Sequence, residues 1–358
     1  MIEKVMVVPL NYSHRQEGQI QAFEQIFGYR NTRTMFDYMQ MQRRGLSPHA
    51  ITEEFVRYVL TDEPVDWIWM QLQDSNVIQP WGIQKIKEAR PETFITHWMG
   101  DLRTEVSEYL QAICKITDAT LISNAGQFKM YIDAGARRVE YVQIGLDWDS
   151  DVLGLTWNHW IDPNINGMGM KQLRWEPPFR VPEVVFIGGY YEHFPGHKLR
   201  VDVIRRLMKE GVDVGVVSES GWPSDIPVVG SCHVKAQNAV YRRAKVALSI
   251  NNFNDVNGYF SDRQIIAMAS GTPVVCCRVP GLTRDFIAGG DCMMFHEHDG
   301  LGGDGLDEMA GHVKALLGDT DLRRRIGRSG RYRVMTDHSW YQRILELLPR
   351  IEAWRDDV

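Results

Sequence analysis

The sequence predicts an α/β protein with two Rossmann-like domains, each built around a parallel sheet, and three observations lead to this prediction. Short apolar runs alternate with helical patterns along the chain, which is typical of βαβ units. This alternation stops over 158–182, where four prolines and two glycines stand without periodicity, and it restarts afterwards. The length of 358 residues also suits two domains of ordinary size.

The first half of the chain contains five predicted strands, which are short and mainly apolar. They cover residues 5–10, 67–72, 93–97, 119–123 and 138–143. Helical patterns lie between them at about 52–60, about 101–117 and near 126–134. Thr52 is the predicted N-cap of the first of these helices.

The second half repeats the pattern and then ends in helices. Its predicted strands cover 183–187, 212–218, 246–250 and 273–277. Its predicted helices cover 197–210, 237–244, 261–269, 306–317, 320–336 and 340–354.

The composition argues against two classes of protein. A formal net charge of -6 does not suit a protein that holds nucleic acid by bulk positive charge, although it is compatible with a local basic groove. No apolar stretch approaches the roughly 18–20 residues that span a membrane, and the N-terminal segment reads as a buried strand rather than a signal peptide. The five cysteines have irregular spacing without a CxxC pair, which favours a reducing cytoplasm over a disulfide framework or a zinc site.

Glycines follow the first predicted strand of the second half, and ligands bind at such strand ends in open parallel sheets. At Gly188, Gly189 and Tyr190 the bare backbone would let a diphosphate approach closely. Lys198 and Arg200 follow in the next helix and would neutralise phosphate charge. A plain tight turn with solvated basic residues is the alternative interpretation.

A polar loop follows the next strand and contains Ser218, Glu219 and Trp222. Such a loop could border a nucleoside. A surface turn with a packing tryptophan explains it equally well.

A third loop leads into the helix predicted at 261–269 and carries the strongest signal. Small residues at 267, 269 and 270 let this helix pack closely on the sheet, and its first turn offers free N–H groups and partial positive charge to a phosphate. Asp262 would accept hydrogen bonds from sugar hydroxyls, and Arg263 would pair with phosphate or form a structural ion pair. The predicted donor-binding residues of this segment are Asn257, Gly258, Tyr259, Phe260, Ser261, Asp262 and Arg263.

The helix and strand after this loop resemble a known family. Residues 267–275 read AMASGTPVV, which is similar to the AMAxGxPVV signature of group-1, family-4-like glycosyltransferases. Similarity to CgeB-like and phage-encoded members extends to three further segments, which are 259–263, 322–327 and 338–340. The resemblance covers about 184–348 and is weak over the first 160 residues.

The resemblance implies the GT-B fold, in which two Rossmann-like domains face an interdomain cleft. It implies an acceptor-side domain at 1–165, a linker at 166–182 and a nucleotide-sugar-binding domain at 183–339, with a helix of 340–358 that packs back on the first domain. Many relatives carry two glutamates that reach the donor sugar and the ribose, whereas this chain has Gly258 and Ile266 there. Asp262 is the predicted replacement, and a non-catalytic sugar-nucleotide-binding module is the alternative.

Polar residues after the strands of the first half are the candidates for the acceptor side. His97 or Asp101 would orient or deprotonate an acceptor hydroxyl. Alternatively, Asp101 caps a helix and His97 is a satisfied residue at a strand end. The other predicted acceptor-side residues are Asn11, Tyr12, His14, Asp74, Asn76 and Trp98.

The predicted activity is transfer of a hexosyl group from a nucleotide-diphosphate sugar, a UDP-sugar being favoured, to an acceptor hydroxyl in the cytoplasm of a bacterium or of a phage-infected host. The resemblance implies retention of configuration without a dedicated nucleophile, so that loop N–H groups and cations would stabilise the departing diphosphate. If the enzyme inverts, Asp101 is the candidate base. No metal and no tightly bound cofactor are expected, since 296–298 lacks metal-ligand spacing. A nucleotide-sugar epimerase of the same fold is the alternative enzyme.

The phage-type resemblance makes a hydroxymethylated pyrimidine in DNA a candidate acceptor. Arg30, Arg33, Arg43 and Arg44 could line a nucleic-acid groove, although a solvated helix face accounts for them better. Glycans and small molecules are the other candidates.

Overall fold

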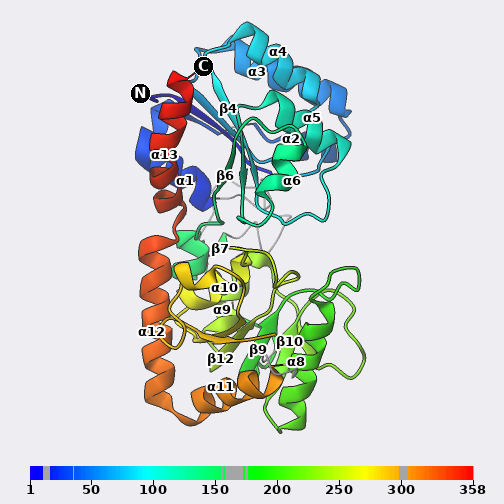
Figure 1. The fold of residues 1–358 in the computed structure, drawn as a ribbon, viewed down its shortest axis with the longest axis vertical. Coiled ribbons are helices and arrows are strands. Elements are labelled where there is room, and N and C mark those ends of the chain that lie inside the picture. Colours follow the sequence, from blue (N-terminus) through cyan, green and yellow to red (C-terminus); the bar gives the residue numbers. More distant parts are fainter. Residues whose placement is uncertain are drawn as a thin grey trace. The chain divides into compact units, whose positions relative to one another are not determined.

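The computed structural model describes residues 1–10, 17–34, 36–154, 156–157, 172–173, 176–297 and 305–357. By its internal contacts the chain forms two compact units: unit 1 comprises Met1–Gly145 and Trp340–Val358, and unit 2 comprises Leu146–Ser339. Each unit contains a six-stranded parallel sheet with helices (Figure 1). The predicted linker 166–182 lies partly outside the described residues.

The sheet of unit 1 has the strand order β2-β1-β3-β4-β5-β6, and every neighbouring pair is parallel. Its strands are β1 (Val5–Val8), β2 (Thr32–Arg33), β3 (Trp67–Met70), β4 (Phe94–Met99), β5 (Ala119–Ile122) and β6 (Val139–Tyr141). Because the strand order reverses between β1 and β3, ligands are expected near the carboxyl ends of these strands. We call this place the switch point of unit 1.

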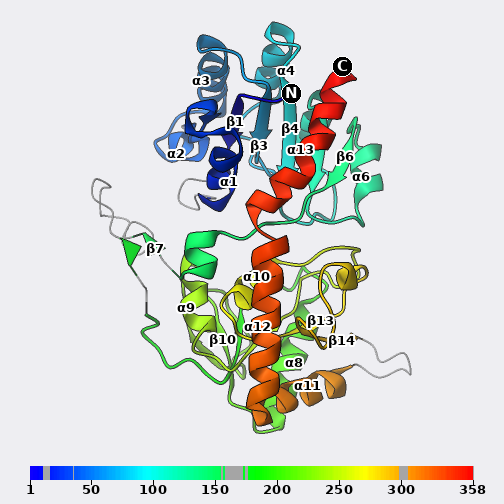
Figure 2. The ribbon, with the colours of Figure 1, turned by 90° about the vertical axis from the view of Figure 1, so that its left-hand side faces the viewer.

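Helices cover both faces of this sheet (Figures 1 and 2). On one face α1 (Glu17–Phe27) and α13 (Trp340–Asp356) lie side by side and pack on apolar residues of β1, β3 and β4. The helices of the other face are α2 (Tyr38–Arg43), α3 (Pro48–Thr61), α4 (Pro80–Ala89), α5 (Glu108–Ile116) and α6 (Phe128–Asp133). A short 3₁₀ turn, η2 (Tyr29–Asn31), precedes β2.

Tryptophans join α13 to the sheet of unit 1. Trp98 of β4 meets Trp340 edge-to-face at a centroid separation of 4.9 Å, and it stacks on Trp69 of β3 at 6.0 Å. Its indole N–H donates to the carbonyl oxygen of Val142 at 2.8 Å. The predicted acceptor-side residue Trp98 is therefore a core residue, with 1% of its surface exposed.

Two predicted helix starts are wrong, and in each case a serine takes the capping role. α3 begins at Pro48, and Ser47 Oγ accepts from the Ala50 N–H at 3.2 Å, because proline suits the first helical position. Thr52 is buried inside the helix. α5 begins at Glu108 with Ser107 as N-cap, so Asp101 lies in the preceding loop and caps no helix.

The sheet of unit 2 has the order β11-β10-β9-β12-β13-β14, and all its pairs are parallel. Its strands are β9 (Val184–Ile187), β10 (Val214–Val217), β11 (Val228–Gly230), β12 (Val246–Ser249), β13 (Val274–Cys277) and β14 (Met293–Phe295). The order reverses between β9 and β12, which defines the switch point of unit 2.

The helices of unit 2 pack in two groups. α8 (His197–Lys209) and α11 (Leu306–Gly318) share one apolar cluster with the sheet. α9 (Gln237–Tyr241) contacts α10 (Asp262–Ala269), and α12 (Thr320–Asp337) packs along α10 (Figure 2). The remaining described elements are the π-helical turn η3 (Trp148–Val152), the 3₁₀ turns η4 (Val234–Ala236) and η5 (Leu282–Arg284), and the antiparallel pair β7 (Thr156–Trp157) and β8 (Gln172–Leu173).

None of the described helices is long and apolar enough to cross a bilayer.

Candidate active site

The side chain of Arg200 in α8 forms hydrogen bonds to both loops at the switch point of unit 2. Its Nε donates to the carbonyl oxygen of Ile250, just after β12, at 3.1 Å. Its Nη1 donates to the carbonyl oxygen of Gly189, just after β9, at 2.8 Å. Only 2% of its surface is exposed, so the loop geometry depends on a buried guanidinium.

A second arginine approaches the same loops from the first turn of α10. Arg263 Nε donates to the carbonyl oxygen of Ile187, and its Nη1 donates to Ser261 Oγ at 2.9 Å. The guanidinium carbons of Arg263 and Arg200 lie 5.0 and 5.4 Å from the centroid of the Phe186 ring. The two cations therefore share one aromatic support.

The charges of this pair are not neutralised by protein carboxylates. In the described part of the chain neither guanidinium makes an ion pair; both bind neutral oxygens instead. Burial, followed by the charge of Arg263, lowers the pKa of Arg200 to about 9. Two neighbouring cations without a counter-charge form a site that favours an anion, and guanidinium groups bind phosphate oxygens strongly.

Gly188 leaves the space that Arg263 occupies. A β-carbon at Gly188 would stand 2.7 Å from Arg263 Nη2, closer than side chains tolerate. The glycine predicted for close ligand approach thus also admits the arginine side chain.

The amino end of α10 adds further positive potential. Ser261 is the N-cap, but its hydroxyl accepts from Arg263 instead of capping a helix N–H. The Ser261 N–H donates to Asn251 Oδ1 at 3.1 Å, and the Arg263 N–H donates to Asp262 Oδ1 at 2.7 Å. Asp262 therefore stands at the helix mouth beside Arg263.

Aromatic side chains border the glycine loop. Trp222 Nε1 donates to the carbonyl oxygen of Gly188 at 3.2 Å, and its ring lies 5.6 Å from the rings of both Phe186 and Tyr190. Ser220, which lies outside the predicted set, accepts from the Tyr190 N–H at 2.8 Å. Its hydroxyl lies 2.9 Å from that of Ser218, and Glu219 between them is exposed.

Other predicted donor-binding residues have structural partners. Lys198 is largely exposed on α8 and pairs with Asp202. Phe260 is buried against Phe286, with their ring centroids 5.3 Å apart, so it stabilises the loop from inside.

The loop before α10 is braced by contacts with the segment after β13. Asn257 Oδ1 accepts from Arg284 Nη2 at 2.7 Å, and the Gly258 N–H donates to the carbonyl oxygen of Pro280 at 2.8 Å. Tyr259 is half-buried in the same loop.

The predicted acceptor-side residues are dispersed. Asn11, Tyr12 and His14 lie outside the described residues. Asp74 is exposed and accepts from Ser107 Oγ at 2.6 Å, and Asn76, also exposed, accepts from Gln79 Nε2 at 2.7 Å through its carbonyl oxygen.

His97 does not occupy the exposed position expected of a catalytic base. It is completely buried in β4, and neither ring nitrogen has a hydrogen-bond partner. Burial, followed by the charge of Arg103, lowers the pKa of His97 to about 3, so the ring stays neutral. Asp101 is exposed in the loop after β4.

A carboxyl group in η3 was missed by the sequence prediction. Asp151 is buried and accepts from the Asp147 N–H at 2.8 Å and from Ser150 Oγ at 3.1 Å. Burial, together with the negative charge of Asp262, raises the pKa of Asp151 to about 8, although the Ser150 hydrogen bond opposes the shift. Asp147 itself forms an ion pair with Lys235. No motif signalled this arrangement, because the burial of an acid after a strand end depends on tertiary packing.

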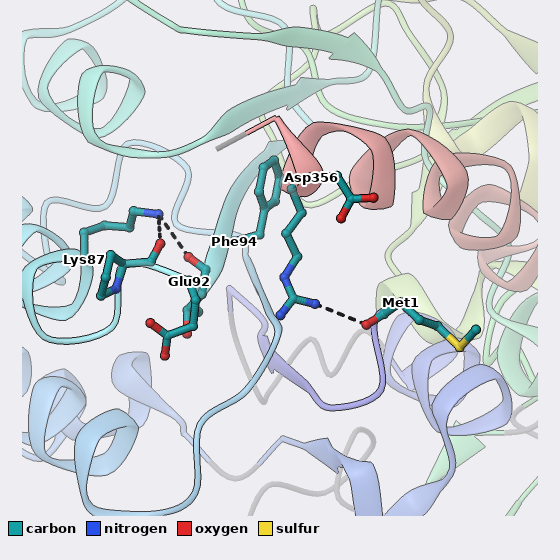
Figure 3. A pocket seen from close by; sticks show the side chains of 8 residues that line it. Met1, Lys87, Glu92, Phe94 and Asp356 are labelled. Carbon is teal, nitrogen blue, oxygen red and sulfur yellow. Dashed lines mark hydrogen bonds between the residues drawn. The ribbon is translucent and has the colours of Figure 1, made fainter.

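A cavity of about 510 Å³ lies elsewhere in unit 1 and does not coincide with these residues (Figure 3). It is lined by residues at the start of β4 and by the end of α13, so it lies at the amino ends of the strands. Its cations are already engaged: Lys87 pairs with Asp118 at 2.9 Å, and Arg355 pairs with Asp66 at 2.6 Å. This cavity therefore contains none of the predicted site residues.

Comparisons with known proteins bear on the fold and on the enzyme class. Residues 199–349 match a family model described as glycosyl transferase-like. The matched residues include α10 and most of unit 2. This match bears out the predicted enzyme class, a glycosyltransferase. No curated protein sequence matches the chain.

Solved structures share the fold over nearly the whole chain. Anabaena HepE in complex with UDP-glucose has 10% identity and a TM-score of 0.58, covering 98% of this chain and 99% of HepE. A UDP-forming α,α-trehalose-phosphate synthase from Burkholderia xenovorans has 13% identity and a TM-score of 0.56, covering 99% of this chain and 98% of the synthase. The N-terminal domain of Candida albicans trehalose-6-phosphate phosphatase has 10% identity and a TM-score of 0.61, covering 99% of this chain and 97% of that domain. The predicted GT-B fold with two Rossmann-like domains is confirmed.

Proposed function

We propose that this chain transfers a sugar from a nucleotide-diphosphate sugar, with a UDP-sugar favoured, to an acceptor hydroxyl. The observation that carries the proposal is the pair Arg200 and Arg263, two cations at the switch point of unit 2 that have no carboxylate partner among the described residues. HepE, which has a similar fold, is described in complexes with UDP-glucose and with UDP.

The donor's diphosphate occupies the space between the Gly188 loop and the amino end of α10. Arg263 and the first N–H groups of α10 face its charge, and Arg200 holds the loops in position. Trp222 and Tyr190 supply an aromatic wall for the nucleoside.

Catalysis rests on stabilising the diphosphate as it leaves. Preorganised cations and N–H groups lower the barrier most where charge develops in the transition state. We include retention of configuration and independence of a metal in the proposal, because the resemblance to family-4-like enzymes implies both. Asp262 takes over hydroxyl binding from the glutamates that Gly258 and Ile266 replace.

The acceptor is better explained as a small molecule than as a hydroxymethylated pyrimidine in phage DNA. Arg33 is 19% exposed at its side chain, pairs with Asp62 at 3.6 Å and donates to the carbonyl oxygen of Glu63, so it does not present a free cation to a phosphate backbone. A duplex requires several free cations, and of the four arginines predicted for a groove Arg30, Arg43 and Arg44 are exposed whereas Arg33 is engaged. The CgeB-like and phage resemblance keeps the DNA acceptor as an outcome to be tested.

Release of nucleoside diphosphate from a panel of nucleotide-sugars tests the proposal. We expect turnover with one donor class, and a fall of about 100-fold or more in Arg263→Gln and in Asp262→Ala with the fold intact. Arg205→Gln is the matched control, because Arg205 is half-exposed on α8 and pairs with Asp225 at 2.7 Å. Full activity in both site variants would refute the placement of the site.

Two other results would replace the proposal with its alternatives. Formation of a free epimer of the donor without acceptor would indicate a nucleotide-sugar epimerase. Donor binding without any turnover, with or without acceptors, would indicate a binding module.

A further inference from the structure

Unit 1 also contains an arginine without a counter-charge, at the carboxyl ends of its strands. Arg103 lies in the loop after β4, and its Nη2 donates to Gln73 Oε1, in the loop after β3, at 3.1 Å. Gln127, in the loop after β5, accepts from the Arg103 N–H at 3.5 Å through Oε1 and donates to the Arg103 carbonyl oxygen through Nε2. The loop after β3 therefore holds the guanidinium of Arg103, and the loop after β5 holds its backbone.

Two other basic side chains of unit 1, Lys87 and Arg90, are engaged more fully. Lys87 pairs with Asp118, and Arg90 donates to three backbone carbonyls. By contrast, Arg103 makes no ion pair within the described residues, and its Nε is buried without a hydrogen-bond partner. Because an unmet charged donor costs free energy, this geometry favours a ligand that supplies an anionic oxygen.

Two buried polar groups near Arg103 also lack partners. His97 has neither ring nitrogen hydrogen-bonded, and the Tyr131 hydroxyl of α6 is buried without a partner. The charge of Arg103 acts on both groups. Burial is the main cause that lowers the pKa of His97, and the charge of Arg103 lowers it further. Burial raises the pKa of Tyr131, and the charge of Arg103 opposes this rise. His97 is neutral, and Asp74 accepts from Ser107 Oγ at 2.6 Å and makes no ion pair with Arg103 within the described residues.

We propose that Arg103 binds an oxyanion carried by the acceptor, so that the acceptor is a small phosphorylated or carboxylated sugar. This inference rests on the proposed function, because only a transferase requires an acceptor in unit 1. The planar guanidinium binds either group through two parallel hydrogen bonds, and Gln73 fixes its orientation. A duplex would require several cations in a row, whereas these strand ends present one guanidinium held in place.

Calorimetry on the full chain tests the proposal with glucose 6-phosphate, glucuronate and glucose as probes. UDP is added to saturation first, so that the arginine pair of unit 2 is occupied and cannot bind the probe anions. We expect at least one of the two anions to bind about 10-fold or more tightly than glucose.

Variants then assign the binding to Arg103. Arg103→Gln should weaken anion binding about 10-fold or more, and Arg103→Lys, which keeps the charge but loses the planar fork, should weaken it less. Arg57→Gln is the control, because Arg57 is exposed and pairs only with Glu54 on α3. If Arg103→Gln does not fold, Arg103→Lys is the test. Unchanged affinity and selectivity for the anions in this variant would contradict binding by the planar guanidinium of Arg103.

The failures are distinguishable. If UDP binds but the anions bind no better than glucose, or if Arg103→Gln binds them like the unaltered protein, this inference is overturned and the proposed function stands. The same holds if a duplex with hydroxymethylated pyrimidines binds tightly and none of the sugars does. If UDP itself does not bind, the proposed function fails and this inference falls with it.

Discussion

Single residues set the charge at the switch point of unit 2. Arg200 and Arg263 are held by carbonyl and hydroxyl oxygens, and neither makes an ion pair within the described residues. The sequence could predict both arginines, because a glycine pair after a strand and a helix that follows a loop mark phosphate sites. It could not show that Arg200 is buried and Lys198 is exposed, since both stand at the start of α8 and only packing separates them.

Replacing Gly188 with alanine should weaken donor binding and also lower the stability of unit 2, because Gly188 has a φ of 155°, which residues with a β-carbon rarely adopt. The new methyl group would stand 2.7 Å from Arg263 Nη2 and would displace that flexible side chain. We expect UDP affinity to fall about 10-fold, the effect of one lost charge-assisted contact, in titration calorimetry. Gly221→Ala is the control, because no atom lies within 4 Å of its added β-carbon. Equal UDP affinity in the two variants would show that Arg263 does not contact the nucleotide.

Asp151 should make unit 2 less stable as the pH rises. Its folded pKa of about 8 lies above its unfolded value near 3.8, so its contribution is fully present below pH 3.8 and is lost as the pH rises to about 8. Between these values the unfolding free energy should fall by at most about 1.4 kcal/mol per pH unit from this group. Asp151→Asn should flatten that decline in chemical denaturation measured from pH 5 to 9. Parallel pH profiles for the two proteins would mean that Asp151 is ionised in the folded state.

At the scale of elements, the close approach of α10 and α12 positions the predicted phosphate site. A β-carbon on Gly327 of α12 would collide with the carbonyl oxygen of Gly271, at the end of α10. Arg331 of α12 donates to the carbonyl oxygen of Ala269 at 2.6 Å and so satisfies the last turn of α10. The helix that presents Arg263 is thus fixed from its far end.

Gly327→Ala should therefore destabilise unit 2, although alanine is the better helix former. Overpacking against backbone costs about 1–3 kcal/mol, which exceeds the gain in helix propensity. Gly311→Ala in α11 is the matched control, because nothing lies within 4 Å of its β-carbon, and it should be neutral or stabilising by up to about 1 kcal/mol. Denaturant midpoints of both variants measure the difference, and equal midpoints would contradict the packing account.

The elements that sequence patterns predicted well are those with unambiguous periodicity and clear ends. α8, α10, α11, α12 and α13 begin within one residue of their predicted starts, because apolar spacing and glycine stops are local features. The starts of α3 and α5 were mispredicted, because several residues could cap each helix and tertiary contacts chose the serines. The edge strands β11 and β14 were missed, although β6, which also has three residues, was predicted within 138–143.

At the scale of the whole molecule, the chain passes from unit 1 to unit 2 and returns. The return places α13 in unit 1, where Trp340 packs against Trp98 and Trp69. Unit 1 therefore depends on a segment that follows all of unit 2 in sequence. Resemblance to a family predicted this return, whereas the amphipathic pattern of α13 alone could not name its partner.

Trp340→Ala should destabilise unit 1 selectively. Removing a buried tryptophan costs about 3–5 kcal/mol, and the lost contacts lie within unit 1. Tyr341→Ala is the control on the same helix, because 41% of Tyr341 is exposed. Hydrogen exchange resolved by peptide should show faster exchange in β3 and β4, with exchange in β9 and β12 unchanged. Equal acceleration in both units would contradict the assignment of the Trp340 contacts to unit 1.

The central claim is that the arginine pair of unit 2 binds the diphosphate of a nucleotide-sugar. Titration calorimetry of UDP and of uridine into the full chain and into Arg263→Gln tests it most directly. We predict that UDP binds at least about 100-fold more tightly than uridine to the unaltered protein, and that Arg263→Gln removes most of this difference. Equal affinities for UDP and uridine, or a difference that survives in Arg263→Gln, would contradict the claim.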